Sequence, residues 1–253
     1  MRANIAKQTV LITGASSGIG LETARALADE ANGDIKLILT ARRVEKLDEA
    51  KKELESKYEA IKVYTASLDV SKPQLIKDFV KSIPEEFADI DILVNNAGLA
   101  LGRDPVGTID IADVQAMLDT NVLGLITLTQ EIVPRMIKRN KGDIVNVGSI
   151  AGRNPYPGGA IYCSTKAAVK FFTRSLRKEL ADTRIRVIEV APGAVKTEFS
   201  IVRYKGDQEK ADEVYKDKDP LIAQDIADFI VYACTRRKTA VIAEAVIFPS
   251  YQA

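Results

Sequence analysis

Tyr162 and Lys166 are the two side chains whose types and spacing best suit acid–base chemistry. They lie four residues apart, and on a helix that spacing places both on one face. A free phenol, with a pKa of about 10, exchanges protons poorly at neutral pH, but a nearby ammonium favours the phenolate and lowers this pKa. Tyr162 is therefore predicted to be a general acid or base. Because ordinary solvated helices also carry such pairs, the prediction depends on the rest of the chain.

Composition excludes several classes of function. The chain has 253 residues, 46% hydrophobic and 28% charged, with a net charge of +1, so no nucleic-acid or membrane partner is expected. It contains no histidine, which excludes a Ser-His-Asp triad and a His-ligated zinc site, and no metal site is expected. The two cysteines, Cys163 and Cys234, form no disulfide framework, so a cytoplasmic location is expected. No apolar run is judged long enough to span a bilayer, and no signal peptide is recognised.

Apolar, β-rich runs alternate with stretches of helical periodicity along the whole chain. Strands are expected at 8–13, 35–40, 61–66, 90–95, 143–147, 184–190 and 241–248. Helices are expected at 18–31, 44–57, 73–82, 111–138, 159–181 and 223–235. This alternation implies parallel βαβ units with right-handed crossovers. The predicted fold is therefore α/β: one domain, 1–253, with a single Rossmann-type, doubly wound parallel sheet flanked by helices.

The polar segment 197–220 is the one irregular stretch, rich in lysine, aspartate and glutamate. It follows a strand at the edge where open α/β sheets place their ligands. We interpret it as a small helical substrate lid, and the alternative is a solvated loop.

A glycine-rich loop follows the first strand and opens the first helix. Its glycines allow a tight turn and a close backbone approach, and the helix N-terminus offers unpaired N–H groups to a pyrophosphate. The strand–loop–helix context of a dinucleotide site is met. The loop residues predicted to contact the cofactor are Gly14, Ser16, Ser17, Gly18, Ile19 and Gly20.

The end of the second strand indicates which dinucleotide is bound. NAD enzymes usually place a carboxylate there for the ribose 2′-hydroxyl, whereas this chain has Arg42 and Arg43. A guanidinium binds a 2′-phosphate through charge-assisted, often bidentate, hydrogen bonds. NADP(H) is therefore the predicted cofactor, and two solvated arginines at a helix start are the alternative.

Two further turns are predicted to contact the cofactor. Asp69 and Val70 follow the third strand, where a carboxylate can meet the adenine amine. Asn95, Ala97 and Gly98 follow the fourth strand, where a backbone of small residues can run along the cofactor. Ordinary turns are the alternative for both.

Together these motifs resemble the short-chain dehydrogenase/reductase family. The glycine-rich loop at 13–20, Asn-Asn-Ala-Gly at 95–98, Ser149, Tyr-Cys-Ser-Thr-Lys at 162–166 and the Pro-Gly at 192–193 occur in the family's order and cover essentially the whole chain. A closer resemblance is to the NADP-dependent 3-hydroxy acid dehydrogenases, which also act on serine and allo-threonine. It rests on 93–98, 148–152, 156–162 and 197–207.

The resemblance implies a catalytic set of four residues. Tyr162 would exchange a proton with the substrate oxygen, and Ser149 would hydrogen-bond that oxygen as charge develops. Lys166 would hold the nicotinamide ribose and lower the phenol pKa, and Asn121 would anchor a water linking Lys166 to solvent. After the sixth strand, the residues expected at the carboxamide end of the cofactor are Pro192, Gly193, Val195 and Thr197.

The implied reaction is hydride transfer between NADP(H) and a 3-hydroxy acid such as L-serine, L-allo-threonine or a 3-hydroxybutyrate-like compound. Such a substrate carries a carboxylate, so a cation is expected near the pocket. The candidates are Arg203, Lys205 and Arg153, and we choose Arg203 because its planar fork suits a carboxylate.

Three other functions are weighed against this one. The main alternative is a broad carbonyl reductase of ketones, keto esters or dicarbonyls. A 3-ketoacyl-carrier reductase is disfavoured because no basic docking patch is identified. An idle NADP-binding sensor is disfavoured because it would not need Ser149, Tyr162 and Lys166.

The family resemblance also implies a homotetramer built on the helices at 111–138 and 159–181. Packing within one subunit is the alternative explanation of their apolar stripe. The apolar residues considered for this interface are Val122, Leu125, Leu128, Ala168, Phe171 and Phe172.

Overall fold

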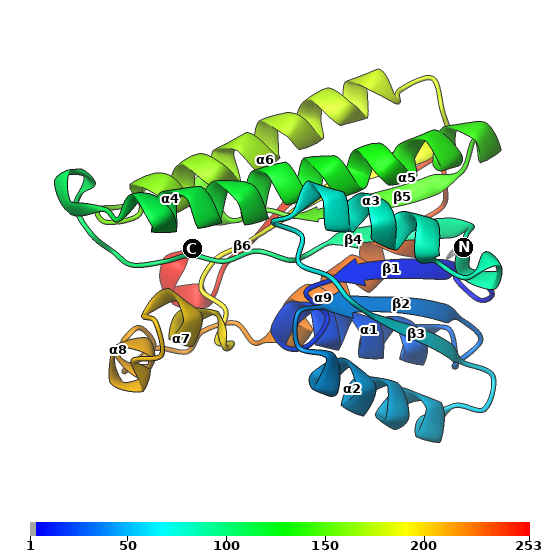
Figure 1. The fold of residues 1–253 in the computed structure, drawn as a ribbon, viewed down its shortest axis with the longest axis horizontal. Helices are drawn as coiled ribbons and strands as arrows, with labels where there is room; N and C mark the ends of the chain where they lie inside the picture. The colour runs from blue at the N-terminus through cyan, green and yellow to red at the C-terminus, as the bar shows by residue number, and fades with distance from the viewer. Residues whose placement is uncertain (1–3) are drawn as a thin grey trace.

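A computed structural model describes residues 4–253 and shows a parallel sheet between two layers of helices (Figure 1). In this described part the sheet has seven strands in the order β3-β2-β1-β4-β5-β6-β7. The strands are β1 Thr9–Thr13, β2 Lys36–Ala41, β3 Lys62–Ser67, β4 Ile90–Asn95, β5 Gly142–Val147, β6 Ile185–Pro192 and β7 Glu244–Ile247. The strand order reverses between β1 and β4, because after β3 the chain returns to the other side of β1 to form β4. Such a switch point opens a crevice at the carboxyl ends of the strands. The predicted doubly wound sheet is confirmed.

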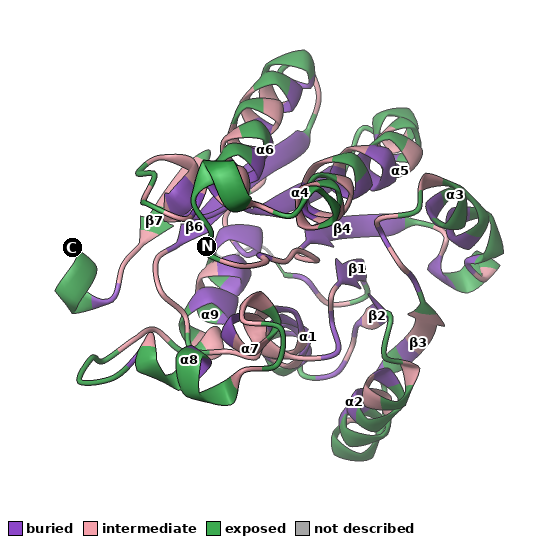
Figure 2. Ribbon diagram, turned by 60° about the vertical axis from the view of Figure 1, so that its left-hand side comes forward, coloured by how far each residue is buried: buried purple, intermediate pink, exposed green. Residues whose placement is uncertain are grey.

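Residues of β1 that alternate in sequence face two separate hydrophobic cores. Val10 and Ile12 belong to the core shared with α1, α2 and α9, whereas Leu11 belongs to the core shared with α3, α5 and α6. The helices α1, α2 and α9 cover one face of the sheet, and α3, α5 and α6 cover the other (Figures 1 and 2). Their bounds are α1 Gly18–Glu30, α2 Val44–Lys57, α3 Pro73–Ser82, α5 Leu125–Arg139, α6 Ala160–Glu179 and α9 Ala223–Cys234. Burial on both faces explains why the central strands read as continuous apolar runs.

The helix expected at 111–138 is not a uniform α-helix. It consists of α4, Ile111–Leu118, a π-helical turn at Asp119–Gly124, and α5. Single π-helical turns inside α-helices occur frequently at functional sites.

This helix also corrects the expectation that no apolar run can span a bilayer. The continuous stretch Ile111–Arg139 has 29 residues and is long and apolar enough, by length and composition alone, to cross a membrane. One such helix is weak evidence, because core helices of soluble proteins pass the same test. Here the stretch lies against α3, α6 and β4.

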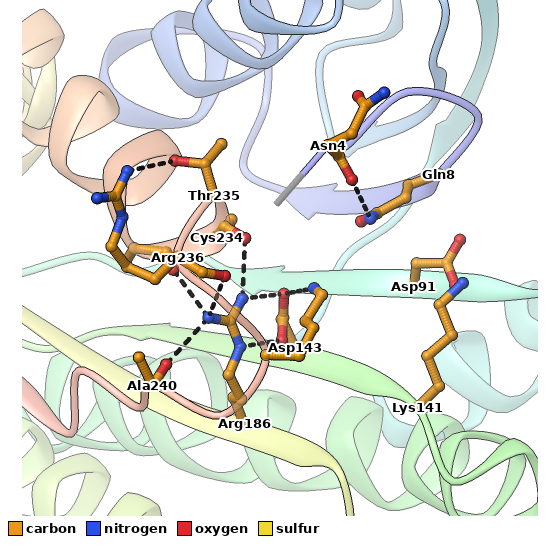
Figure 3. Close-up of polar contacts among 12 residues, drawn as sticks. Asn4, Gln8, Asp91, Lys141, Asp143, Arg186, Cys234, Thr235, Arg236 and Ala240 are labelled. Atoms are coloured by element: carbon orange, nitrogen blue, oxygen red, sulfur yellow. Dashed lines mark hydrogen bonds and ion pairs between the residues drawn. The ribbon is translucent and has the colours of Figure 1, made fainter. Parts of the chain in front are cut away.

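A buried charge cluster lies at the amino ends of β5 and β6, opposite the crevice (Figure 3). Arg186, at the start of β6, forms a bidentate ion pair with Asp143 of β5 at 2.7 and 2.6 Å, and both are almost fully buried. Lys238 donates to the same carboxylate at 2.7 Å. The Arg186 guanidinium also donates to the carbonyls of Ala233 and Cys234 at the C-terminal end of α9, where a cation is favoured by the helix dipole. This cluster joins two strands to α9, far from the crevice.

The segment 197–220 crosses the crevice side of the sheet and contains two short helices, α7, Phe199–Arg203, and α8, Gln208–Glu213 (Figure 1). It is therefore partly helical, as expected, rather than an irregular loop. Tyr215 anchors it, because its hydroxyl lies 2.6 Å from the Ser200 hydroxyl and donates to the Val195 carbonyl at 2.9 Å.

Candidate active site

A cleft of about 390 Å³ opens at the carboxyl ends of the strands. It gathers the loops that follow β1 to β6, so residues as far apart in sequence as Gly14 and Val202 meet there. The catalytic candidate Ser149 lies in its wall. The lining also contains these residues predicted to bind the cofactor: Gly14, Ser16, Ser17, Gly18, Ile19, Arg42, Arg43, Asp69, Val70, Ala97, Gly98, Tyr162, Lys166, Pro192, Gly193, Val195 and Thr197. Gly20, Asn95 and Asn121, which were predicted as well, do not line it.

The glycine-rich loop has the shape that a pyrophosphate requires. Gly14 and Gly18 have φ of +66° and +54°, in the left-handed region that favours glycine. Ser17 caps α1 without a side-chain hydrogen bond to it, so first-turn N–H groups are left for an anion. Gly20 contributes by packing rather than by lining the cleft, because a Cβ there would lie 2.5 Å from the Gly14 carbonyl oxygen. The loop therefore fits a dinucleotide phosphate.

The structure corrects the role expected of Asn95. Asn95 ends β4 inside the protein, 3% exposed, and its amide donates to Thr129 and Asn146 at 3.0 and 2.9 Å. The next residue, Asn96, faces the cleft and donates to the carbonyls of Thr13 and Gly14 at 2.9 and 3.2 Å. Successive strand residues point to opposite faces, so a shift of one residue exchanges a core amide for one that shapes the loop.

One corner of the cleft is strongly basic. Arg43 donates from Nη2 to the Ser16 and Ser17 hydroxyls at 3.1 and 2.8 Å, and from Nη1 to Glu198 at 2.7 Å. Lys46 donates to the other oxygen of Glu198 at 2.8 Å. These donors suit a ribose 2′-phosphate. Neither Lys46 nor Glu198 was recognisable from the sequence, because Glu198 lies more than 150 residues from Arg43 and no local motif joins them.

Tyr162, Lys166 and Ser149 are brought together in the cleft wall. The Lys166 Nζ lies 5.9 Å from the centroid of the Tyr162 ring and donates to the Val147 carbonyl at 2.9 Å. Ser149 begins the short turn after β5, where its hydroxyl accepts from the Ala151 N–H at 3.1 Å. These backbone contacts fix the Lys166 and Ser149 side chains beside Tyr162.

The electrostatics of this trio differ from the prediction. Burial raises the pKa of Tyr162 above its usual value, and a hydrogen bond with Ser149 and the charge of Arg203 oppose the shift without cancelling it. Burial lowers the pKa of Lys166 to about 8. The expected lowering of the phenol pKa by Lys166 is therefore not seen here, because desolvation outweighs the neighbouring charges. Tyr162 is therefore a protonated phenol at neutral pH, ready to donate.

Asn121 lies in the π-helical turn, 2% exposed. Its Oδ1 accepts from the Leu99 N–H at 2.8 Å, and its Nδ2 donates to the Leu99 carbonyl and to Thr165 at 2.7 and 3.0 Å. These bonds tie the turn after β4 to α6, which carries Tyr162. Its side chain thus holds the wall of the cleft from behind, and the water-anchoring role stays a prediction.

Of the three candidate cations, Arg203 is the one next to Tyr162. Its guanidinium lies 5.8 Å from the Tyr162 ring centroid. Nε donates to the Gly102 carbonyl at 3.1 Å and Nη1 to the Tyr156 hydroxyl at 2.7 Å, whereas Nη2 is buried without a partner in the described chain. The free donor is therefore one nitrogen, not the planar fork expected from the sequence.

The other two candidate cations are engaged elsewhere. Arg153 forms a bidentate pair with the buried Glu189, both bonds being 2.8 Å, and also contacts Glu244 at 3.0 Å. Lys205 is 58% exposed and pairs with Asp113 at 2.8 Å. None of the three lines the cleft itself; Arg203, together with Tyr162, lines a smaller pocket beside it.

Comparisons with known proteins agree with this geometry. A protein-family model described as short chain dehydrogenase matches residues 8–208. The chain is 55% identical to the NADP-dependent 3-hydroxy acid dehydrogenase of Schizosaccharomyces pombe over 245 residues, covering 97% of this chain and 93% of that protein. It is 43% identical to sulfoacetaldehyde reductase 2 of Chromohalobacter salexigens, covering 96% and 95% of the two chains.

A solved structure described as the closed form of serine dehydrogenase complexed with NADP+ has a TM-score of 0.91 to this fold. It is 40% identical in sequence, and the match covers 96% of both chains. The chain thus has the fold, the glycine-rich loop and the Ser149–Tyr162–Lys166 site, and it is similar to these proteins over nearly its full length. The chain belongs to the short-chain dehydrogenase family.

Proposed function

We propose that this protein transfers hydride between NADP(H) and 3-hydroxy acids or the corresponding carbonyl compounds, with the whole chain acting as one catalytic domain. The observation that carries the substrate class is Arg203, whose guanidinium lies beside Tyr162 and whose buried Nη2 has no partner in the described chain. A buried, unpaired cationic donor is costly, and a substrate carboxylate would satisfy it. L-Serine, L-allo-threonine and 3-hydroxybutyrate-like compounds carry that carboxylate close to the reacting carbon.

The cofactor is NADP(H), and Arg43 with Lys46 and the loop serines offers donors for its 2′-phosphate. When bound, the nicotinamide supplies or accepts the hydride. The relatives described as NADP-dependent, and the similar structure with NADP+ bound, support this cofactor.

Tyr162 acts as the general acid in the direction of reduction. Burial holds its proton in place, and the Ser149 hydroxyl can share the developing charge on the substrate oxygen. In the reverse direction the phenol must lose its proton, and the nearby Arg203 charge, which lowers the phenol pKa, favours that step. Lys166, held by the Val147 carbonyl, is placed to orient the ribose.

A broad carbonyl reductase is the second candidate, because the side of the cleft next to Tyr162 is partly apolar. Leu99, Phe199 and Val202 line it, and the Phe199 and Tyr162 ring centroids are 5.6 Å apart. Such a wall suits neutral ketones, keto esters or dicarbonyls. In either case the segment 197–220 serves as the substrate lid.

The two functions are separated by an Arg203→Ala variant assayed on 3-hydroxybutyrate and on its neutral methyl ester. Loss of a charged hydrogen bond should lower kcat/KM for the acid by about 10- to 100-fold, with little change for the ester. Lys205→Ala, from the same segment, is the matched control and should leave both values near wild type. An equal effect of Arg203→Ala on both substrates would favour the broad reductase.

We also propose a homotetramer, with the helices α5 and α6 facing a second subunit. Phe171 of α6 is 63% exposed, and Leu118, Leu123 and Ile137 of the 111–139 stretch are exposed as well. Of the residues expected at this interface, Leu125 and Leu128 are buried within the subunit and do not reach it.

A cytoplasmic setting with small-molecule partners fits the two free, buried cysteines and the net charge of +1.

A further inference from the structure

Two segments far apart in the sequence meet at the basic corner of the cleft. Glu198 directly precedes α7, at the beginning of the lid, while Arg43 ends the β2 turn and Lys46 lies in the first turn of α2. The carboxylate of Glu198 accepts one hydrogen bond from each cation, at 2.7 and 2.8 Å, using both of its oxygens. The lid is thus fastened to the cofactor cleft by two ion pairs.

The same guanidinium also serves the glycine-rich loop. Arg43 donates from Nη1 to Glu198 and from Nη2 to the hydroxyls of Ser16 and Ser17. A ribose 2′-phosphate bound at this corner would need these donors. The carboxylate that NAD enzymes place at the end of β2 is missing here, and one from the lid takes a position on the arginine instead.

We propose that Glu198 is a specificity-determining residue: it holds the 2′-phosphate donors Arg43 and Lys46 in the cofactor-free enzyme, and the 2′-phosphate of NADP(H) displaces it. This rests on the proposed assignment of Arg43 to the 2′-phosphate. A phosphate and a carboxylate sharing the same two cations repel each other, so the phosphate binds fully only when Glu198 leaves. Hydrogen bonds from Lys46 and Arg43 hold the pKa of Glu198 at about 2, so the carboxylate is charged throughout the neutral range.

Two consequences follow from this displacement. First, the ion pairs of Glu198 lower the affinity for NADP(H) but not for NAD(H), whose 2′-hydroxyl does not compete for the cations. Second, arrival of the 2′-phosphate releases the start of the lid, which carries Phe199 and Arg203 next to Tyr162. Cofactor binding at one end of the cleft is thereby linked to the lid at the substrate end.

The test is calorimetric binding of 2′,5′-ADP and 5′-AMP, which differ only in the 2′-phosphate, to wild type and Glu198→Gln. We expect the variant to bind 2′,5′-ADP about 3- to 10-fold more tightly, the scale of one or two partly exposed ion pairs. Binding of 5′-AMP should change less than about 2-fold. Glu209→Gln, which removes a negative charge from the exposed face of α8, is the control for net charge and should match wild type.

Unchanged or weaker binding of 2′,5′-ADP by Glu198→Gln would overturn the proposal. An Arg43→Leu variant distinguishes this failure from failure of the cofactor-site assignment. If Arg43→Leu loses the preference for 2′,5′-ADP over 5′-AMP while Glu198→Gln has no effect, the assignment stands and the displacement is wrong. If Arg43→Leu keeps the preference, the assignment itself is wrong, and with it the basis of the proposal.

Discussion

Lys166 places an amine where water cannot solvate it, 6% exposed, and this has a thermodynamic consequence. Burial lowers its pKa from 10.5 to about 8 in the folded protein. Below pH 8 both states carry the proton, and the folded state bears the cost of the buried charge. Between about 8 and 10.5 the unfolded chain binds more protons, so stability rises with pH across this window.

We expect Lys166→Met to abolish this rise. At pH 7 the variant should be more stable than wild type, because it does not bury a charge. A pKa shift of this size corresponds to roughly 3 kcal/mol, so this difference in the free energy of unfolding should shrink by up to that amount between pH 7 and pH 10. The stability gained at pH 7 is partly offset because the Val147 carbonyl loses its hydrogen-bond donor in the variant. Urea unfolding at several pH values measures the slope, and Lys170→Met reports the effect of losing another lysine from α6. A wild-type slope in Lys166→Met would show that burial of this amine does not control the pH dependence.

At the scale of single elements, the π-helical turn at Asp119–Gly124 matters because it places Asn121 behind the cleft. An Asn121→Ala change leaves both the N–H and the carbonyl of Leu99 without their side-chain partner. The expected loss in the free energy of unfolding is about 1–3 kcal/mol, and turnover should fall with it as the wall loosens. Thermal unfolding and kcat, measured together, test this. Lost turnover with unchanged stability would instead support the water-anchoring role predicted from the family.

The elements also show what the sequence could predict. Strand and helix positions followed from hydrophobic periodicity, and the glycine-rich loop was recognisable because its chemistry is local. The π-helical turn was not, since hydrophobic periodicity does not distinguish a continuous α-helix from one that contains a single π-helical turn. Asn95 was expected at the cofactor although the end of its strand was predicted correctly, because the sequence does not show that Asn95 turns into the core and Asn96 toward the cleft. The pairing of Arg43 with Glu198 joins residues that only the folded sheet brings together.

At the scale of the whole molecule, the doubly wound sheet was predictable because each βαβ unit repeats one rule. The outer surface is different, since an apolar stripe is compatible with both a subunit core and an interface. The structure divides that stripe: Leu125 and Leu128 are buried within the subunit, while Phe171 is exposed. A contiguous exposed apolar patch that spans adjacent helices is a typical mark of a protein contact.

We therefore expect Phe171→Asp to break the proposed tetramer. A carboxylate at the centre of an apolar helix interface would be desolvated without a partner, which costs several kcal/mol for each copy of the contact. Leu75→Asp is the control, because Leu75 is also exposed but lies on α3, on the far side of α5 from α6 (Figure 2). Sedimentation velocity should show smaller particles for Phe171→Asp and unchanged ones for Leu75→Asp. If wild type itself sediments as a monomer, or if Phe171→Asp leaves the tetramer intact, the assembly does not use this face of α6.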